Sequence, residues 1–325
     1  DGKTWTLTES SKLEIIEGSS LTTNGSGKFI NEGIIEVNSA DALKNAINLC
    51  SGTIKLMDNI NVVNSVDVNV EEGYTTSLLI SNNVTLDLNG HTLTLSSAGS
   101  GIYVGAGGYL TIMDSSNSKG SIIYTYSDMS NATIMVNGTS PDYAQLVLEK
   151  CNIFVVNTTG AYDAGYGVFA STYSKVSSDK DVSITAGYSA ISGNGTDNGA
   201  EITISGGKYT SNASAAIFFP STTNLTVTGG KFIGKTGFDI RAGTVSISNA
   251  EISINQNEPI DSTGASGPSS WGMGVAVIDH PNYGSVGTTG NKSYSDISVT
   301  ISKTAVTGAK YDLYVGDLNR GKNGE

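Results

Sequence analysis

The chain has 325 residues and a formal net charge of −12, and only 15% of its residues are charged. An acidic chain with two arginines has no basic face to neutralise phosphates, which excludes a nucleic-acid-binding protein. No run of 18 apolar residues occurs, so the sequence predicts no membrane insertion.

Few charges beside abundant Ser, Thr, Asn and Gly are typical of exported bacterial solenoid proteins. The sequence starts at Asp1 without a signal peptide, which would fit a mature form whose targeting signal has been removed. We therefore expect a secreted or cell-surface protein, favour a monomer, and predict that its partner is a polysaccharide or a host or microbial surface glycan.

Residues 1–38 are predicted to form N-terminal strands, either as one or two coils or as a hairpin. The next segment, 39–50, is the best helix in the sequence, with Ser39 as N-cap and Asp41 complementing the helix dipole. Its apolar residues recur at helical spacing and form one stripe. They are Leu43, Ala46, Ile47 and Cys50. This pattern predicts a helix that covers the first coils of the domain that follows.

Residues 39–325 are predicted to be one repeat domain, in which short strands alternate apolar residues with Ser or Thr. Three series of such strands follow one another in a fixed order. The first series starts at Val84, Leu110, Leu146, Val182, Ile202, Leu225, Val245 and Val299. The second starts at Gly101, Ala132, Gly167, Ser189, Ala216, Phe238, Val275 and Asp312. The third starts at Ser121, Asn152, Lys208, Lys231 and Glu251.

Three short strands per repeat describe the coil of a right-handed parallel β-helix, with coils stacked at about 4.8 Å. Forty glycines permit tight corners, and only five prolines interrupt the strand ladders. A β-sandwich is the alternative, but the fixed order of the three series argues against it. The fold class is therefore an all-β solenoid with an N-terminal α-helix.

Two cysteines, Cys50 and Cys151, lie several coils apart. A disulfide needs Cα atoms within about 7 Å, so we expect two small buried side chains instead of a disulfide.

The stretch Val84-Thr-Leu-Asp-Leu-Asn-Gly-His-Thr-Leu93 resembles the pectate-lyase-like right-handed β-helix superfamily. The stretch 165–241 is similar to bacterial adhesin-like surface β-helix proteins. The resemblance implies the fold and an extracellular setting, and it leaves the activity open because one solenoid hosts many chemistries.

Enzymes of that superfamily suggest patterns to look for. Hydrolases carry paired Asp residues, Gly-His-Gly and Arg-X-Lys, none of which occurs in this sequence. Lyases use Ca²⁺ and an Arg or Lys base. The candidate catalytic residues are Asp239, Arg241, Asp279 and His280. The alternative interpretation is that Asp239 and Asp279 are solvated residues of the outer face.

Metal ligands are scarce. His280 has only His91 as a second histidine, in a distant coil, and His91 is expected at the surface. We predict no histidine metal site, while a Ca²⁺ site of carboxylates and carbonyls stays possible because its ligands need no fixed spacing.

Departures from the repeat are the places to look for function. They include Phe219-Pro220 and the loops 255–273 and 281–295, which carry Trp271, Tyr283 and Tyr294 as candidate ligand-binding aromatics. A loop that packs on its own solenoid is the alternative.

The absence of a recognisable catalytic set favours a non-enzymatic, adhesin-like protein that binds glycans or surfaces. A polysaccharide lyase or glycoside hydrolase is the second hypothesis. A phage tailspike-like fibre, which would be a trimer, is the third.

Overall fold

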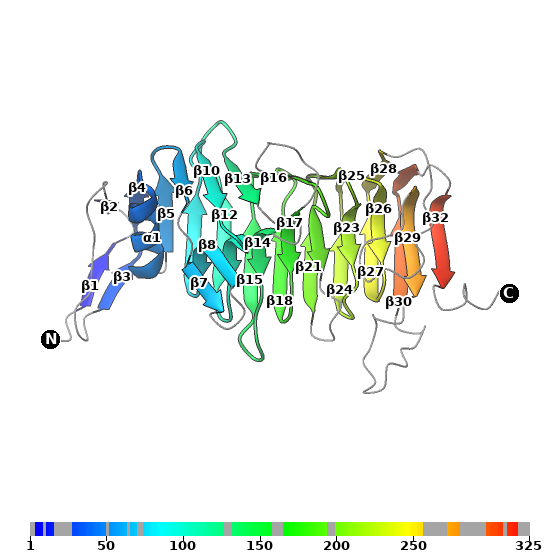
Figure 1. Ribbon diagram of the computed structural model, residues 1–325, viewed down its shortest axis with the longest axis horizontal. Helices are drawn as coiled ribbons and strands as arrows, with labels where there is room; N and C mark the ends of the chain where they lie inside the picture. Colours follow the sequence, from blue (N-terminus) through cyan, green and yellow to red (C-terminus); the bar gives the residue numbers. More distant parts are fainter. Residues whose placement is uncertain are drawn as a thin grey trace.

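The computed structural model describes residues 4–8, 11–15, 28–49, 52–63, 66–69, 74–126, 132–157, 165–193, 199–255, 272–279, 297–307 and 311–317. These residues form a right-handed parallel β-helix, elongated along one axis, with the first and last described segments at opposite ends of the solenoid (Figure 1). No helix in these segments is long and apolar enough to cross a membrane.

Three parallel sheets make up the walls of the solenoid, and each regular coil gives one strand to each sheet. The 11-stranded sheet contains β2 (Lys12–Ile15), β4 (Ile34–Val37), β5 (Gly52–Leu56), β9 (Asn83–Asp87), β12 (Tyr109–Met113), β15 (Ala144–Leu148), β18 (Ser174–Ser178), β21 (Ala200–Ile204), β24 (Asn224–Val227), β27 (Gly243–Ser248) and β30 (Ile297–Ser302).

The nine-stranded sheet contains β6 (Ile60–Val62), β10 (Thr92–Ser96), β13 (Ser121–Tyr126), β16 (Asn152–Asn157), β19 (Ser183–Ala186), β22 (Lys208–Ser211), β25 (Gly230–Gly234), β28 (Ala250–Ile254) and β31 (Ala305–Thr307). The ten-stranded sheet contains β7 (Val66–Asn69), β8 (Tyr74–Ile80), β11 (Ser100–Val104), β14 (Ala132–Val136), β17 (Tyr166–Ala170), β20 (Ile191–Gly193), β23 (Ala215–Phe219), β26 (Thr236–Ile240), β29 (Met273–Asp279) and β32 (Tyr311–Asp317).

The predicted strand series correspond to these sheets. The second series forms the ten-stranded sheet and the third forms the nine-stranded sheet. One assignment is wrong: Val182-Ser-Ile-Thr lies at β19, in the nine-stranded sheet. The strand that stacks between β15 and β21 is β18, with the sequence Ser-Lys-Val-Ser-Ser. Its single apolar residue, Val176, gives too weak an alternation to be recognised.

Helix α1 (Ala40–Leu49) begins as predicted, because the Ala42 N–H donates to Ser39 Oγ at 3.3 Å. Its buried residues are Ala42, Leu43, Ala46 and Ile47, whereas Cys50 lies outside the described residues. The helix joins β4 to β5 and contacts β6 and β8, the first strands of the other two sheets apart from the antiparallel β7. It therefore covers the start of the core.

The segment before α1 continues the solenoid instead of forming a hairpin. Strand β2 pairs with β4 and β4 pairs with β5, all in parallel. Two further strands, β1 (Thr4–Leu7) and β3 (Lys28–Asn31), form a separate parallel pair beside α1 (Figure 1). The 11-stranded sheet thus extends past the helix, in accordance with the prediction of coils in this region.

The core is a column of side chains from all three sheets, and aromatic residues fill its later coils. Tyr209 stacks on Phe232, with ring centroids 5.0 Å apart, and Phe232 meets Phe238 at 4.7 Å. The Tyr209 hydroxyl lies 2.6 Å from Ser178 Oγ, and burial raises the pKa of this phenol above its ordinary value. Cys151 is fully buried with a free thiol, as expected.

Glycine lets the ten-stranded sheet approach the nine-stranded sheet closely. A Cβ added at Gly237 would lie 2.1 Å from Ile252 Cγ2 and 2.4 Å from the Gly274 carbonyl oxygen. Only a residue without a side chain fits at this contact.

Candidate functional site

The candidate catalytic residues Asp239 and Arg241 lie together, and both side chains are buried. The Arg241 Nε–H donates to Asp239 Oδ1 at 2.5 Å, and Nη2 donates to Oδ2 at 3.1 Å. Asp239 is 0% and Arg241 1% exposed. The interpretation of Asp239 as a solvated outer-face residue is therefore wrong.

The remaining sequence candidates fall where the structure gives no side-chain placement. The Asp279 backbone pairs with Asp317 at the end of β29. Its side chain, and His280, Trp271, Tyr283 and Tyr294, lie outside the described residues. Phe219 and Pro220 are buried, next to Arg241, whose N–H donates to the Phe219 carbonyl at 2.9 Å.

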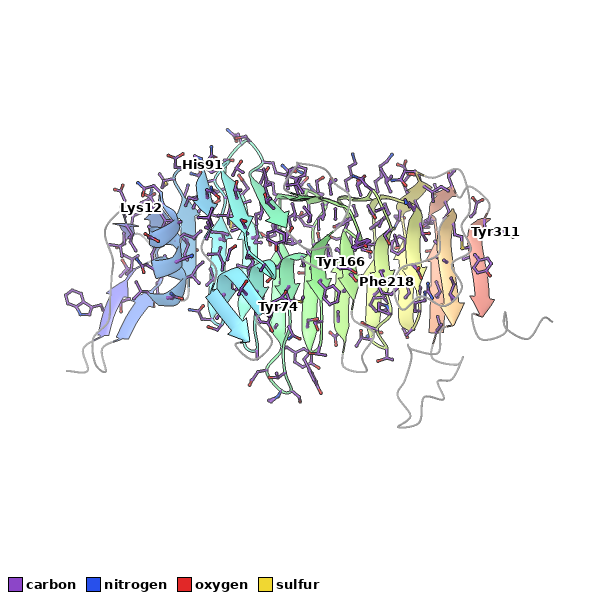
Figure 2. The ribbon with its side chains drawn as sticks, in the orientation of Figure 1. Lys12, Tyr74, His91, Tyr166, Phe218 and Tyr311 are labelled. Atoms are coloured by element: carbon purple, nitrogen blue, oxygen red, sulfur yellow. The ribbon has the colours of Figure 1, made fainter. Side chains whose placement is uncertain are left out.

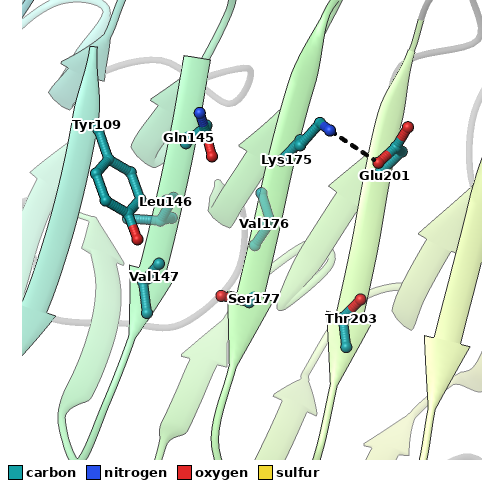
Figure 3. Close-up of a pocket in the computed structure, with 9 residues that line it drawn as sticks. All are labelled: Tyr109, Gln145, Leu146, Val147, Lys175, Val176, Ser177, Glu201 and Thr203. Carbon is teal, nitrogen blue, oxygen red and sulfur yellow. Dashed lines mark ion pairs between the residues drawn. The ribbon is translucent and has the colours of Figure 1, made fainter. Parts of the chain in front are cut away.

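A shallow depression of about 220 Å³ lies on the outer face of the 11-stranded sheet, across β12, β15, β18 and β21 (Figure 3). Four residues in consecutive coils form its outer row, because they are paired partners in the parallel ladder. They are Tyr109, Gln145, Lys175 and Glu201. A second row, two residues further along each strand, contains Thr111, Val147, Ser177 and Thr203, of which the last three line the depression.

The charged side chains of the outer row, Lys175 and Glu201, are about half exposed to solvent. Lys175 Nζ lies 3.5 Å from Glu201 Oε2, and the two side chains are 47% and 46% exposed. A surface ion pair of this kind contributes about 0–1 kcal/mol, so either partner can exchange its contact for a ligand at little cost.

Two further aromatic rings border the row at the corner that precedes β15 and β18. Lys175 Nζ lies over the Tyr143 ring, 4.9 Å from its centroid. Tyr173 meets Tyr143 edge to face at 5.7 Å. These contacts hold the Lys175 ammonium over the Tyr143 ring.

This arrangement brings together hydrogen-bond donors, acceptors and ring faces on a rigid sheet. Gln145 offers a donor and an acceptor, Lys175 a cation, and Glu201 an anion. Tyr109 adds a flat face with a hydroxyl at its tip. A shallow, open surface of this composition suits a ligand rich in hydroxyl groups.

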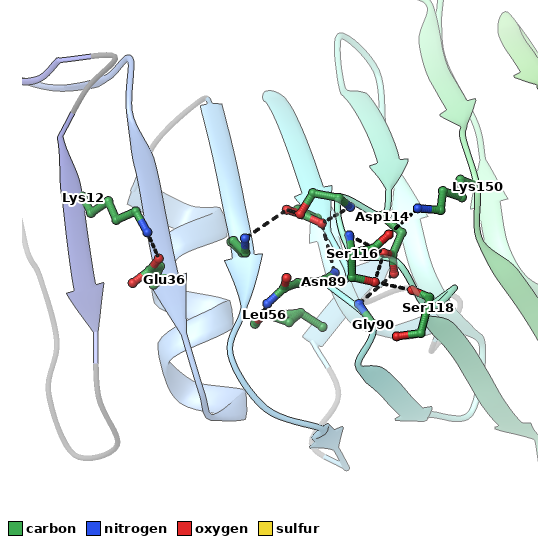
Figure 4. Close-up of polar contacts among 12 residues, drawn as sticks. Lys12, Glu36, Leu56, Asn89, Gly90, Asp114, Ser116, Ser118 and Lys150 are labelled. Carbon is green, nitrogen blue, oxygen red and sulfur yellow. Dashed lines mark hydrogen bonds and ion pairs between the residues drawn. The ribbon is translucent and has the colours of Figure 1, made fainter.

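Two buried carboxylates, Asp87 and Asp114, lie at the corner between the 11-stranded and nine-stranded sheets and are candidate ligands for a cation (Figure 4). Asp114 accepts from the N–H groups of Gly90 at 2.8 Å, Ser116 at 2.8 Å and Gly120 at 2.6 Å. Burial alone would raise the pKa of Asp114, but hydrogen bonds from Ser116, Gly90 and Gly120 hold it below its ordinary value.

Asp87, one coil earlier, accepts from the N–H groups of Asn89 and Ser115 at 2.9 Å each. The Lys55 ammonium lies 4.0 Å away. Both carboxylates therefore already accept hydrogen bonds from the backbone N–H groups of the corner. Within the described segments, no group of three or more His, Cys, Asp or Glu side chains could hold a metal ion. The Ca²⁺ site stays a prediction.

Sequence reasoning missed the depression. Three members of its outer row, Tyr109, Gln145 and Glu201, directly precede apolar residues that start strands of the first series, so aligning the repeats would have shown most of the row. The fourth member, Lys175, could not be found in this way. The predicted series contained Val182 instead of Val176, so an alignment would have put Asp181 in the row where the structure has Lys175.

Comparison of the chain with protein-family models, with curated proteins and with solved structures gave no match.

Proposed function

We propose that the protein is a non-enzymatic, carbohydrate-binding β-helix, and that its ligand lies along the outer row of the 11-stranded sheet. The observation that carries the proposal is the row Tyr109, Gln145, Lys175 and Glu201, aligned over four coils along one surface depression. A row that crosses strands runs along the solenoid axis, so an extended chain of sugars can contact successive coils.

Three features support this function. The site is assembled on strands, which position side chains more precisely than loops do. Its ion pair exposes both charges to solvent, so its polar atoms are accessible. Finally, the composition and the resemblance described above favour a secreted, bacterial, adhesin-like protein related to the pectate-lyase-like superfamily, which is the finer part of the proposal.

A glycan array followed by titration calorimetry tests the proposal. Tyr109→Ala and Lys175→Ala should each weaken the best ligand about 5- to 30-fold, because central contact residues contribute roughly 1–2 kcal/mol. Lys231→Ala is the matched control. Lys231 forms the same kind of cross-coil pair with Glu251, at 2.5 Å and similar exposure, on the nine-stranded sheet.

The control variant should bind like the wild type. Failure to bind any glycan or cell surface would sink the proposal. Equal losses of affinity in Lys175→Ala and Lys231→Ala would show that the ligand does not bind along the outer row. Release of shortened or unsaturated products from a bound polysaccharide would instead favour the enzyme hypothesis.

A further inference from the structure

The outer face of the ten-stranded sheet carries a second, different surface. Its outward row begins with Leu79, Tyr103, Met135 and Phe169, which are paired partners in consecutive coils and are all partly exposed. Figure 2 shows Tyr74, Tyr166 and Phe218 following one another along this side of the solenoid. Over these coils, four adjacent outward positions carry no polar side chain other than the Tyr103 hydroxyl.

Neighbouring rings fix both aromatic members of this row. Tyr74 meets Tyr103 edge to face, with centroids 6.0 Å apart. Tyr166 meets Phe169 at 5.2 Å and Tyr188 at 5.5 Å. Pairs of this kind hold ring orientations, so the surface is preformed.

A short polar network lies beside the rings. Asn137 Nδ2 donates to the Tyr103 hydroxyl at 2.8 Å, and Thr172 Oγ1 donates to Asn137 Oδ1 at 2.8 Å. The network orients Tyr103 and places the Asn137 amide and the Thr172 hydroxyl next to its ring. The following residue, Tyr173, contacts Tyr143, whose ring lies under Lys175 of the outer row, so the two surfaces adjoin at this corner.

No charge lies in the chain segments that build this face. Asp, Glu, Lys and Arg are absent from residues 74–80, 100–108, 132–137, 165–172 and 187–193. The row also has a defined end, because its next members, Ser192 and Phe218, are only 1% and 5% exposed. The face therefore spans a few coils only.

We infer that this face, defined by Leu79, Tyr103, Met135 and Phe169, is a second carbohydrate site that takes an uncharged, extended oligosaccharide. Tyr103 and Phe169 are two coils apart, or two strand spacings of roughly 4.8 Å, so two sugar rings of one chain can stack on them. The apolar faces of neutral sugars match the rings, and their hydroxyls match Asn137 and Thr172. The inference goes beyond the proposed function, since it concerns another sheet and restricts the ligand to uncharged sugars.

Titration calorimetry with cellohexaose, mannohexaose and xylohexaose as probes tests this site. At least one should bind the wild type, and Tyr103→Leu and Phe169→Leu should each weaken it about 3- to 10-fold, the range expected for one aromatic contact. Phe154→Leu is the control, because Phe154 is a partly exposed outward residue of the nine-stranded sheet.

Hydroxyl-radical footprinting of the wild type gives a second readout that needs no variant. The bound probe should protect Tyr103 and Phe169 from oxidation. Protection of Tyr109 and Tyr143 instead would overturn this inference while supporting the proposed function. Lack of binding by all three neutral probes overturns it whether or not charged glycans bind.

Discussion

Asp239 and Arg241 form a bidentate ion pair that is closed off from solvent, although they stand two residues apart at the end of β26. A buried charge is costly unless it is paired, so each side chain depends on the other. The pair forms where the chain turns from the ten-stranded to the 11-stranded sheet.

The first prediction concerns the stability supplied by this pair. Arg241→Met and Asp239→Leu should each lower the free energy of unfolding by about 3–5 kcal/mol, because each leaves a buried charge without its partner. The double variant should be more stable than either single variant. Urea unfolding followed by circular dichroism measures all three. Additive losses would contradict the interpretation, as would a single variant with wild-type stability.

The fold could be predicted because its signals are local and repeated. Alternating apolar residues appear in each coil, and corner glycines separate them, so three strand series emerge from the sequence alone. The exception is β18, where Ser174 and Ser178 occupy inward positions and only Val176 is apolar. In a solenoid, the neighbouring coils supply the apolar contacts that such a strand lacks.

The candidate sites were harder to predict because they depend on alignment between coils. Gln145 and Lys175 look like ordinary surface residues in their own strands, and only the ladder places them side by side. Asp239 shows the opposite problem. Strand alternation correctly places it on the outward side of β26, but an outward position does not guarantee exposure.

A second prediction tests the close contact between sheets. Gly237→Ala should destabilise the protein by about 1–3 kcal/mol or more, because the new methyl group would overlap Ile252 and the Gly274 carbonyl. Gly105→Ala is the control, since its Cβ would meet nothing closer than 3.5 Å. Thermal unfolding of both variants decides the matter, and similar melting temperatures would refute the packing argument.

A third prediction concerns Cys151. Burial raises the pKa of its thiol to about 12, so the reactive thiolate is scarce at neutral pH and reagents cannot reach it. Iodoacetamide should leave Cys151 unmodified in the native protein and label it fully in denaturant, as read by peptide mass spectrometry. Rapid labelling under native conditions would show that the coil around β15 and β16 opens.

The fourth prediction concerns Asp114 and acid stability. Because the folded-state pKa lies below the ordinary value, the carboxylate stabilises the fold fully above the unfolded pKa of about 3.9, and this contribution is lost as the pH falls through the folded value. Asp114→Asn should therefore cost about 2–3 kcal/mol at neutral pH, because the amide carries no charge and has one acceptor oxygen in place of the two that accept from Gly90, Ser116 and Gly120.

The difference in unfolding free energy between Asp114→Asn and the wild type should shrink below about pH 4. There the wild-type carboxylate is protonated, first in the unfolded state and then, at its lower pKa, in the folded state. Denaturant unfolding at a series of pH values measures this difference directly. Asp142→Asn is the control, since this carboxylate is exposed and the substitution should change little at any pH. A difference that stays constant down to about pH 2 would mean that the substituted amide destabilises the corner through its shape, and that the charge of Asp114 does not hold the corner.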